Sequence, residues 1–230
     1  ERFPGAVSTF CVEGMMQDGK ALQAGTSHFL GQNFSKASEI KYQNRNGKNE
    51  YAWTTSWGVS TRLIGGMIMT HADDDGMIMP PRLAPQHIVI IPHIRNEENS
   101  EEIINYCNKL VSNLSQINYK DRNIEVKIDK RDIKISEKTW SWIKKGVPIR
   151  LEIGMREINE NSVFLARRDT GEKFNIKYDK LLDDISVLLD NIQISMFKKA
   201  KDFSSKHTVE IDNYEEFKKF FSEKKINKTE

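Results

Sequence analysis

The sequence has little cysteine, little net charge and no long apolar run. Cys11 and Cys107 are the two cysteines in 230 residues, and no CxxC pair or metal-ligand spacing surrounds them. Such isolated cysteines suit a reducing cytosol. No segment approaches the roughly 18 apolar residues of a membrane helix, and the first residues do not resemble a signal peptide. We therefore expect a cytoplasmic protein with no membrane association.

The net charge of +2 does not by itself indicate a nucleic-acid-binding protein. Residues 120–180 are the most basic part, with 16 Lys and Arg against 11 Asp and Glu. This excess fits a shallow RNA-facing patch or an ordinary solvated surface, and composition favours the second. With 38% hydrophobic residues, the chain is long enough to bury one or two cores.

Residues 51–79 are the most informative stretch. They predict a strand over 51–57, a turn at Gly58 and a helix that begins near Ser60 or Thr61 and ends near His71. Arg62 then lies in the first helical turn, at the positive end of the helix dipole. An arginine at a helix N-terminus is suited to bind phosphate. Pairing with a nearby carboxylate is the alternative, and the local pattern leaves both open.

A second polar feature precedes this stretch. Residues 9–12 and 21–30 are predicted strands, and we interpret Gln23, Thr26 and His28 as a polar stripe on one face of the second. An amide, a hydroxyl and an imidazole on one face indicate either a solvent-exposed surface or the lining of a polar pocket.

His71 and the run Asp73-Asp74-Asp75 contain metal-ligating residue types. We interpret them as a solvated helix C-terminus followed by a turn at Gly76, because aspartates and glycine are common where a helix ends in solvent. No metal site is expected.

Prolines in residues 80–85 predict a stiff linker, after which strands and helices alternate. Alternation of this kind indicates an α/β unit with a mixed, largely covered sheet of about five strands and three helices. The expected strands are 88–92, 126–129, 149–153 and 162–168, and the expected helices are 100–117, 137–145 and 180–191. A short amphipathic helix is expected over 211–221.

Four segments carry a resemblance to a known family: LQAGTSHFLGQNFSK, TSWGVSTRLIGGMIMTHADDDGMIMPPRLAP, GVPIRLEIGMREI and VFLARRDTGEKF. Together they resemble prolyl-tRNA synthetase of the archaeal and eukaryotic type, a class II aminoacyl-tRNA synthetase, over nearly residues 1–180. The resemblance implies that residues 1–84 are the C-terminal part of the catalytic domain. This part would be an α+β remnant whose antiparallel sheet carries the third signature motif as a strand and helix.

The same resemblance implies that residues 85–192 are the anticodon-binding domain and that residues 193–230 begin a C-terminal extension. In the family this extension often carries a zinc-supporting cysteine cluster. No cysteine follows Cys107, so we expect no zinc.

The resemblance also assigns roles to single residues. Arg62 corresponds to the catalytic arginine that contacts the ATP phosphates, and Gln23 and Thr26 correspond to further ATP-binding residues. The proline pocket would involve Phe3, His28, Ser56, Trp57 and Gly58. A packing role is the alternative for each of these five, above all for Trp57 as a structural wall.

For the anticodon, the matching residues are Arg150, Glu152, Arg156, Arg167 and Arg168. Bases in an unstacked loop are recognised through their edges, and glutamate can accept from the guanine amino group. Alternation places Arg150 and Glu152 on one strand face. A salt bridge on the sheet surface is the equally valid alternative for any one pair.

The implied activity is ATP-dependent activation of L-proline, followed by transfer to tRNA(Pro), with ATP and Mg²⁺ as cofactors. The family's first two signature motifs are not in this sequence, so we expect the chain alone to be inactive and the full-length protein to be a homodimer. The alternatives are a catalytically inactive tRNA-binding paralogue and a class II synthetase for threonine, glycine or histidine. Retention of Gln23, Thr26, His28 and Arg62 argues against the first, and the GTSH and SWGVSTR segments argue against the second.

Overall fold

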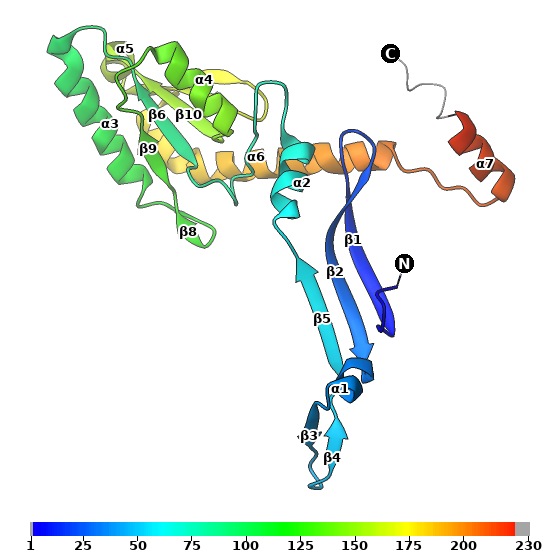
Figure 1. The fold of residues 1–230 in the computed structure, drawn as a ribbon. Coiled ribbons are helices and arrows are strands. Elements are labelled where there is room, and N and C mark those ends of the chain that lie inside the picture. The colour runs from blue at the N-terminus through cyan, green and yellow to red at the C-terminus, as the bar shows by residue number, and fades with distance from the viewer. Residues whose placement is uncertain (1, 224–230) are drawn as a thin grey trace.

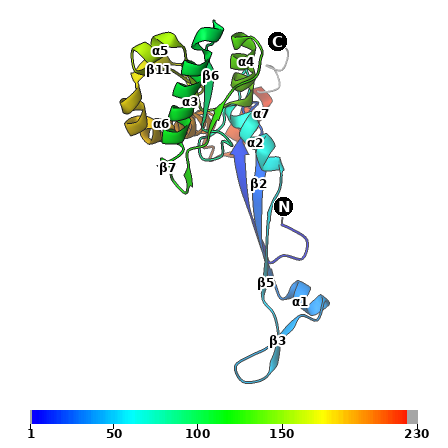
Figure 2. The ribbon, with the colours of Figure 1, turned by 90° about the vertical axis from the view of Figure 1, so that its left-hand side faces the viewer.

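The computed structural model describes residues 2–223 and contains two parts, with a long helix that runs from the second part to the first (Figure 1). The first part is a three-stranded antiparallel sheet that projects from the rest of the molecule as a narrow arm (Figure 2). Its strands lie in the order β1 (Ser8–Met15), β2 (Ala21–Gly31) and β5 (Thr54–Val59). At the far end of the arm lie α1 (Asn33–Ala37) and a small hairpin of β3 (Lys41–Gln43) and β4 (Asn49–Tyr51).

A β-bulge in β2 determines which polar side chains share a face. Gln23 and Thr26 are three residues apart, so regular alternation would place them on opposite faces. The register shifts by one residue at Ala24, which returns Gln23 to the face of Thr26 and His28. The predicted polar stripe is confirmed, and the bulge produces it. The partners of these three residues on β1 alternate regularly: Glu13, Cys11 and Thr9.

Gly58 lies inside β5, so the predicted turn at this position is wrong. It pairs with Thr26 one position before the end of the ladder, and the strand continues to Val59. A Cβ atom at Gly58 would lie 3.3 Å from Thr26 Oγ1, which explains the glycine by close packing rather than by a turn. The predicted strand over 51–57 is likewise divided, because Tyr51 ends β4 and β5 begins at Thr54.

The helix α2 (Arg62–His71) follows β5 and packs against β2. Gly66 allows this approach, because a Cβ atom there would lie 2.9 Å from Leu22 Cδ2. This apolar face of the arm lies opposite the polar stripe, and the part of it away from α2 is open to solvent among the described residues. Phe10, Trp57 and Val59 are 70–80% exposed on it. The arm is therefore stabilised mainly by the hydrogen bonds between its strands and by packing against α2, since its sheet is not covered on both faces.

The second part contains the predicted mixed sheet, with five strands in the order β12-β11-β10-β6-β9. Strands β10, β6 and β9 are parallel to one another, and β11 is antiparallel to both β10 and β12. The sequence analysis missed β12 and a short β7–β8 hairpin, because neither shows a clear apolar alternation. The bounds are β6 (Ile88–Pro92), β7 (Asn118–Tyr119), β8 (Arg122–Asn123), β9 (Val126–Ile128), β10 (Ile149–Ile153), β11 (Ser162–Arg167) and β12 (Lys173–Lys177).

Helices cover both faces of this sheet. The main core lies between the sheet, α3 and α6, and includes Ile88, Ile90 and Leu151. A smaller core lies under α4 and contains Val89 and Ile91. Four helices occur instead of the three expected, since the sequence analysis missed the short α5. The bounds are η1 (Glu97–Asn99), α3 (Ser100–Leu114), α4 (Ile135–Lys145), α5 (Met155–Asn159) and α6 (Tyr178–Lys206).

The helix α6 is far longer than the predicted segment 180–191. Its apolar stripe continues past that segment through buried Ile192 and Met196, and the helix reaches α2 of the first part (Figure 1). The expected domain boundary at residue 193 therefore falls inside α6. A final helix, α7 (Tyr214–Glu223), follows. Residues 224–230 of the expected extension lie outside the described residues. Within residues 2–223, every helix is too short or too polar to cross a membrane.

Buried His87 fixes the linker between the two parts. The Glu125 N–H donates to His87 Nδ1 over 2.9 Å, and the Arg122 guanidinium lies 3.1 Å from Nε2. Arg122 also donates to the carbonyl oxygens of Pro81 and Ala84. Burial and the neighbouring Arg122 lower the pKa of His87 to about 4. The imidazole is therefore neutral in the folded protein at neutral pH.

This environment predicts an acid-sensitive fold. The folded pKa of His87 lies below its ordinary value near 6.5, so stability is full above that pH and decreases as pH falls towards 4. Because the unfolded chain binds a proton at His87 that the folded chain does not bind, we expect the free energy of unfolding to fall by about 2 kcal/mol from pH 7.5 to pH 5. Urea denaturation at the two pH values measures this loss. The His87→Gln variant should lose that much less over the same interval; an equal loss would contradict the assignment.

Candidate functional site

Arg62 is the first residue of α2 and lies beside the polar face of the arm. Its guanidinium is exposed, and Nη1 lies 3.5 Å from the Gln23 carbonyl oxygen. Within residues 2–223 it has no carboxylate partner, so the ion-pair alternative is not realised there. The Arg62 N–H already donates to Ser60 Oγ, and the Leu63 N–H donates to the Ser60 carbonyl oxygen. The attraction for an anion at this terminus therefore comes mainly from the guanidinium and the helix dipole.

The three residues assigned to ATP meet at one open hollow. Gln23 and Thr26 come from β2, and Arg62 comes from α2. Gly25 and Gly58 lie between them and leave the backbone accessible to a ligand. The complete lining is Gln23, Ala24, Gly25, Thr26, Gly58, Val59, Ser60 and Arg62. A cation, an amide and a hydroxyl around exposed backbone can hold a phosphate group together with a polar ring or ribose.

Further along the same face, Phe3 and His28 form an aromatic pair with ring centroids 4.6 Å apart. Ser56 is the partner of His28 on β5 and shares its face. Trp57 belongs to the opposite face, where its side chain is 80% exposed. The structure therefore brings Phe3, His28, Ser56 and Gly58 together on the polar face, and it places Trp57 elsewhere.

Thr9 and Cys11 also belong to this polar face, and the sequence analysis missed both. The Phe3 N–H donates to Thr9 Oγ1 over 3.0 Å, and Oγ1 lies 3.0 Å from His28 Nδ1. Gln23 Nε2 donates to Cys11 Sγ over 3.2 Å. Their strand was predicted, but the register that sets them opposite His28 and Gln23 could not be read from the sequence.

The residues assigned to the anticodon lie in the second part. Arg150 Nε donates to Glu152 Oε1 over 3.0 Å, and His93 Nε2 lies 3.1 Å from Glu152 Oε2. His93, with Arg150, lowers the pKa of Glu152 to about 2. Glu152 is therefore an ionised acceptor at neutral pH. The sequence analysis missed His93, which directly follows a strand predicted to be buried.

A hollow lies next to this ion-pair cluster, at the carboxyl ends of the parallel strands β6 and β10. This edge of a parallel sheet is a common place for ligands. Arg156 lines the hollow with an exposed side chain, which pairs with Glu160. The other polar side chains of the lining are His93, Arg95, Asn96, Asn99 and Glu157.

Arg167 and Arg168 are held by carboxylates of the protein itself. Arg167 makes two hydrogen bonds to Asp169, of 3.0 and 2.8 Å. Arg168 is nearly buried, and it pairs with Asp73 through both ends of its guanidinium. It also donates to the carbonyl oxygens of Gly76 and Ile143, each at 3.2 Å. Arg168 therefore connects β11 to the loop after α2, and none of its guanidinium donors points to an open surface.

The predicted exposed turn over residues 73–76 is confirmed, since Asp73 and Gly76 hydrogen-bond to each other and the three aspartates are exposed. The structure adds a partner for Asp73, because the Arg168 guanidinium binds it and lowers the pKa of its carboxyl group. Gly76 adopts φ +138°, and a Cβ atom there would lie 2.6 Å from Lys144 Cα. The loop is thus a tight contact between the arm and α4. No group of three or more potential metal ligands occurs within residues 2–223.

Comparison with known proteins defines first the class and then the family. Residues 87–188 match the sequence profile of an anticodon-binding domain, a module of aminoacyl-tRNA synthetases. The chain is 52% identical over 224 residues to a proline–tRNA ligase of Bdellovibrio bacteriovorus and 50% identical to one of Anaeromyxobacter dehalogenans. Each alignment covers 96% of this chain but only 45% and 44% of the relative.

A solved structure agrees with these matches. The chain superposes on prolyl-tRNA synthetase from Cryptosporidium parvum, complexed with L-proline and AMP, with a TM-score of 0.85 and 39% identity. The superposition covers 94% of this chain and 45% of that one. The chain therefore belongs to the prolyl-tRNA synthetase family, and it spans about half the length of the relatives that it matches.

The hydroxyl of Thr9 predicts the tautomer of His28. Because Oγ1 accepts from the Phe3 N–H, its own proton is free to donate to Nδ1, which leaves the imidazole N–H on Nε2. We expect ¹⁵N NMR of the chain to show the Nε2–H form of neutral His28. Thr9→Val should remove this preference and Thr9→Ser should keep it. Identical His28 shifts in wild type and Thr9→Val would contradict the assignment.

The ion pair of Asp73 and Arg168 predicts a stability effect. Asp73→Asn keeps the acceptor oxygen for the loop amides but removes the charge that faces Arg168. We expect a loss of roughly 1–3 kcal/mol in unfolding free energy, measured by urea denaturation. Asp74→Asn is the matched control, because Asp74 is exposed and forms no ion pair among the described residues. Equal stabilities of the two variants would show that the ion pair contributes nothing.

Proposed function

We propose that this chain is the part of a proline–tRNA ligase that contributes one side of the ATP and proline site together with the anticodon-binding domain. The observation that carries this proposal is the meeting of Gln23, Thr26 and Arg62 at one hollow, with Phe3 and His28 further along the same strand face. An anion site beside a small aromatic site is what an enzyme joining ATP to a small amino acid requires.

In the proposed reaction, the carboxylate of proline attacks the α-phosphate of ATP and releases pyrophosphate. The terminal ribose of tRNA(Pro) then takes the prolyl group from the adenylate. Arg62 would bind the phosphates and stabilise the negative charge that develops on them. Gln23 and Thr26 would orient the rest of the nucleotide. No side chain of the protein needs to act as a nucleophile.

Mg²⁺ would supply further positive charge to the phosphates in such a reaction. The residues described here do not form a site for it, since residues 2–223 contain no cluster of three or more potential ligands. We therefore assign no step of the mechanism to a metal held by this chain.

For proline, Phe3 and His28 would form one wall of a small pocket, with Ser56 beside them. The tilted ring pair provides an apolar surface for the pyrrolidine ring, and the imidazole N–H provides one polar contact. Trp57 lies on the opposite face of β5 and is 80% exposed, so we assign it no contact with proline.

For tRNA(Pro), we propose that Glu152 and Arg156 mark the surface that recognises the anticodon. Glu152 remains ionised and can accept hydrogen bonds from a guanine, while His93 and Arg150 hold it in place. The neighbouring hollow has room for an unstacked base, the form in which sequence-specific RNA recognition takes place. Arg167 and Arg168 would act by supporting this region.

The finer architecture is part of the proposal. Residues 1–84 would belong to a class II catalytic domain and carry its third signature motif in β5 and α2. Residues 85–192 would form the anticodon-binding domain, and residues 193–230 would begin an extension. The apolar face of Phe10, Trp57 and Val59 would then be covered by other parts of the full-length polypeptide. We propose that this polypeptide acts as a homodimer in the cytoplasm.

The Arg62→Ala variant of the full-length polypeptide tests the catalytic part. We expect a loss of roughly 100-fold or more in proline-dependent ATP–pyrophosphate exchange, because a charged donor to the phosphates disappears. Arg45→Ala is the matched control, since Arg45 is an exposed arginine at the tip of the β3–β4 hairpin. Equal rates for wild type and Arg62→Ala would refute the role of Arg62.

The same assay separates the alternatives. Exchange that depends on threonine, glycine or histidine instead of proline would identify a different class II specificity. Absence of exchange in a folded full-length protein, with tRNA binding retained, would identify a catalytically inactive tRNA-binding paralogue.

A further inference from the structure

Three cations surround the indole ring of Trp142 on the edge of the five-stranded sheet. Lys145 Nζ lies 4.5 Å from the ring centroid, Lys127 Nζ lies 5.6 Å from it, and the Arg131 guanidinium carbon lies 6.0 Å from it. They come from three segments of the chain: β9, the loop after it and the last turn of α4. We name Lys127, Arg131, Lys145 and Trp142 the Trp142 cationic surface.

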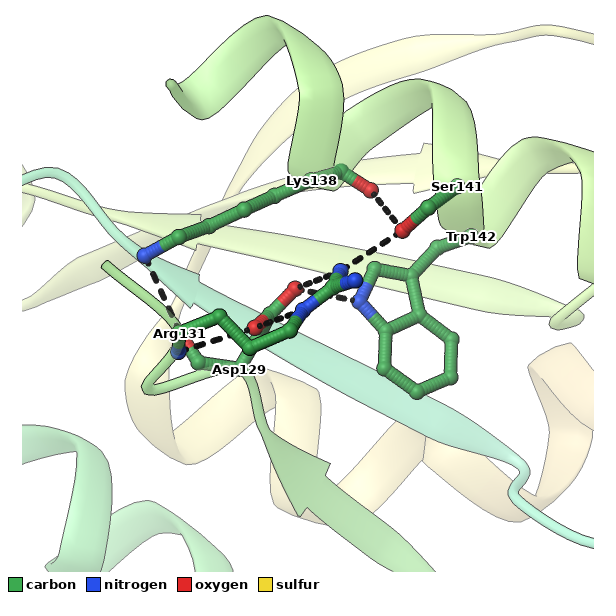
Figure 3. Close-up of polar contacts among 5 residues, drawn as sticks. All are labelled: Asp129, Arg131, Lys138, Ser141 and Trp142. Carbon is green, nitrogen blue, oxygen red and sulfur yellow. Dashed lines mark hydrogen bonds and ion pairs between the residues drawn. The ribbon is translucent and has the colours of Figure 1, made fainter. Parts of the chain in front are cut away.

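A buried carboxylate fixes the centre of this surface (Figure 3). Asp129 accepts from Arg131 Nε at 2.8 Å, from Arg131 Nη2 at 2.6 Å and from Trp142 Nε1 at 2.7 Å. The Arg131 guanidinium thereby holds the pKa of Asp129 far below its usual range. Lys138 donates to the Asp129 main-chain oxygen, and Ser141 accepts from Arg131. The charge of Asp129 is therefore already engaged by Arg131 and the indole.

The two lysines keep an uncompensated charge. Lys127 and Lys145 are exposed, and neither forms an ion pair within residues 2–223. Residues 127–145 contain seven Lys and Arg against three Asp and Glu. Their aliphatic stems help to cover Trp142, which is only 4% exposed, and this packing alone would be an ordinary structural role. The negative face of the indole attracts each ammonium group, and because neither lysine forms an ion pair among the described residues, both charges remain available to a further anion.

The position of the surface indicates which anion is expected. Lys127 pairs with Val89, and Val89 pairs with Arg150 on the next strand, so the three side chains point to the same face of the sheet. The surface therefore continues the face that carries Arg150 and Glu152. An RNA whose bases reach Glu152 would place neighbouring phosphates over this edge.

We propose that the Trp142 cationic surface binds phosphate groups of an RNA backbone. This inference rests on the proposed function for the identity of the RNA, and it adds a site that acts on phosphates without reading sequence. Phosphate contacts fix the register of an RNA on a protein, while contacts to base edges provide specificity. Lys127 and Lys145 would supply affinity, and Glu152 would supply selectivity.

The test compares the full-length Lys127→Gln/Lys145→Gln double variant with wild type in binding of tRNA(Pro) at several salt concentrations. Each lost phosphate contact removes about 0.7–0.9 from the slope of log K against log salt. We expect the slope to fall by about 1.4–1.8 and the affinity to fall by roughly 10-fold. The preference for tRNA(Pro) over a tRNA with a changed anticodon should stay unchanged, as should ATP–pyrophosphate exchange.

Two controls make the result specific. Lys41→Gln/Lys48→Gln removes the same charge from the hairpin at the far end of the arm, where Lys41 also lies over an aromatic ring (Figure 1). This variant should keep the wild-type slope. Lys127→Arg/Lys145→Arg should keep it too, because the charges remain. Thermal unfolding of each variant checks that the fold is intact.

Three outcomes would overturn the inference. A double variant with wild-type slope and affinity would show that the two lysines only cover Trp142. An equal loss in the hairpin control would show a general charge effect. Preferential binding of a phosphoserine peptide, lost in the double variant, would assign the surface to a protein partner. If the wild-type protein binds no RNA, that result refutes the proposed tRNA-binding function of the domain, on which this inference rests.

Discussion

The guanidinium of Arg168 connects the two parts of this chain. It comes from the turn after β11 and binds Asp73 in the loop after α2, together with the carbonyl oxygens of Gly76 and Ile143. Arginine suits this position because its planar group can satisfy several acceptors at fixed angles. Together with α6, which runs from one part to the other, this contact sets where the polar face of the arm lies relative to the five-stranded sheet.

The arm shows how a small backbone irregularity can create a site. Without the bulge at Ala24, Gln23 would face the apolar side of the sheet and could not lie beside Thr26 and Arg62. Glycines at positions 25 and 58 keep the hollow open, and the first turn of α2 brings a cation to its rim. Hydrogen bonds of Thr9 and Cys11 then hold His28 and Gln23 from the neighbouring strand.

In the second part, carboxylates have two distinct uses. Asp129, Asp169 and Asp73 each hold an arginine in place and keep no charge for a ligand. Glu152 also pairs with an arginine, Arg150, but its second partner, His93, lines an open hollow. Under the proposed function, Arg167 and Arg168 build the domain, while Glu152 and Arg156 face the RNA. The sequence analysis had placed these residues in a single set.

The sequence determined the elements and most of the chemistry. A continuous apolar run located the buried strand β6, helical spacing of apolar residues located α2 and α3, and the alternation of strands and helices indicated the mixed sheet, because these patterns report which side chains face a core. The four resembling segments identified the family, and an arginine in the first turn of α2 indicated either an anion site or an ion pair.

The tertiary structure decided what local patterns cannot encode. The bulge at Ala24, the strand position of Gly58 and the pairing of Thr9 with His28 depend on register, which is fixed by contacts between strands far apart in the chain. The full length of α6, the partner of Arg168 and the convergence of Lys127 and Lys145 on Trp142 likewise depend on packing between distant segments. A charged residue in a sequence shows which interactions are possible, and only the fold shows which partner it has.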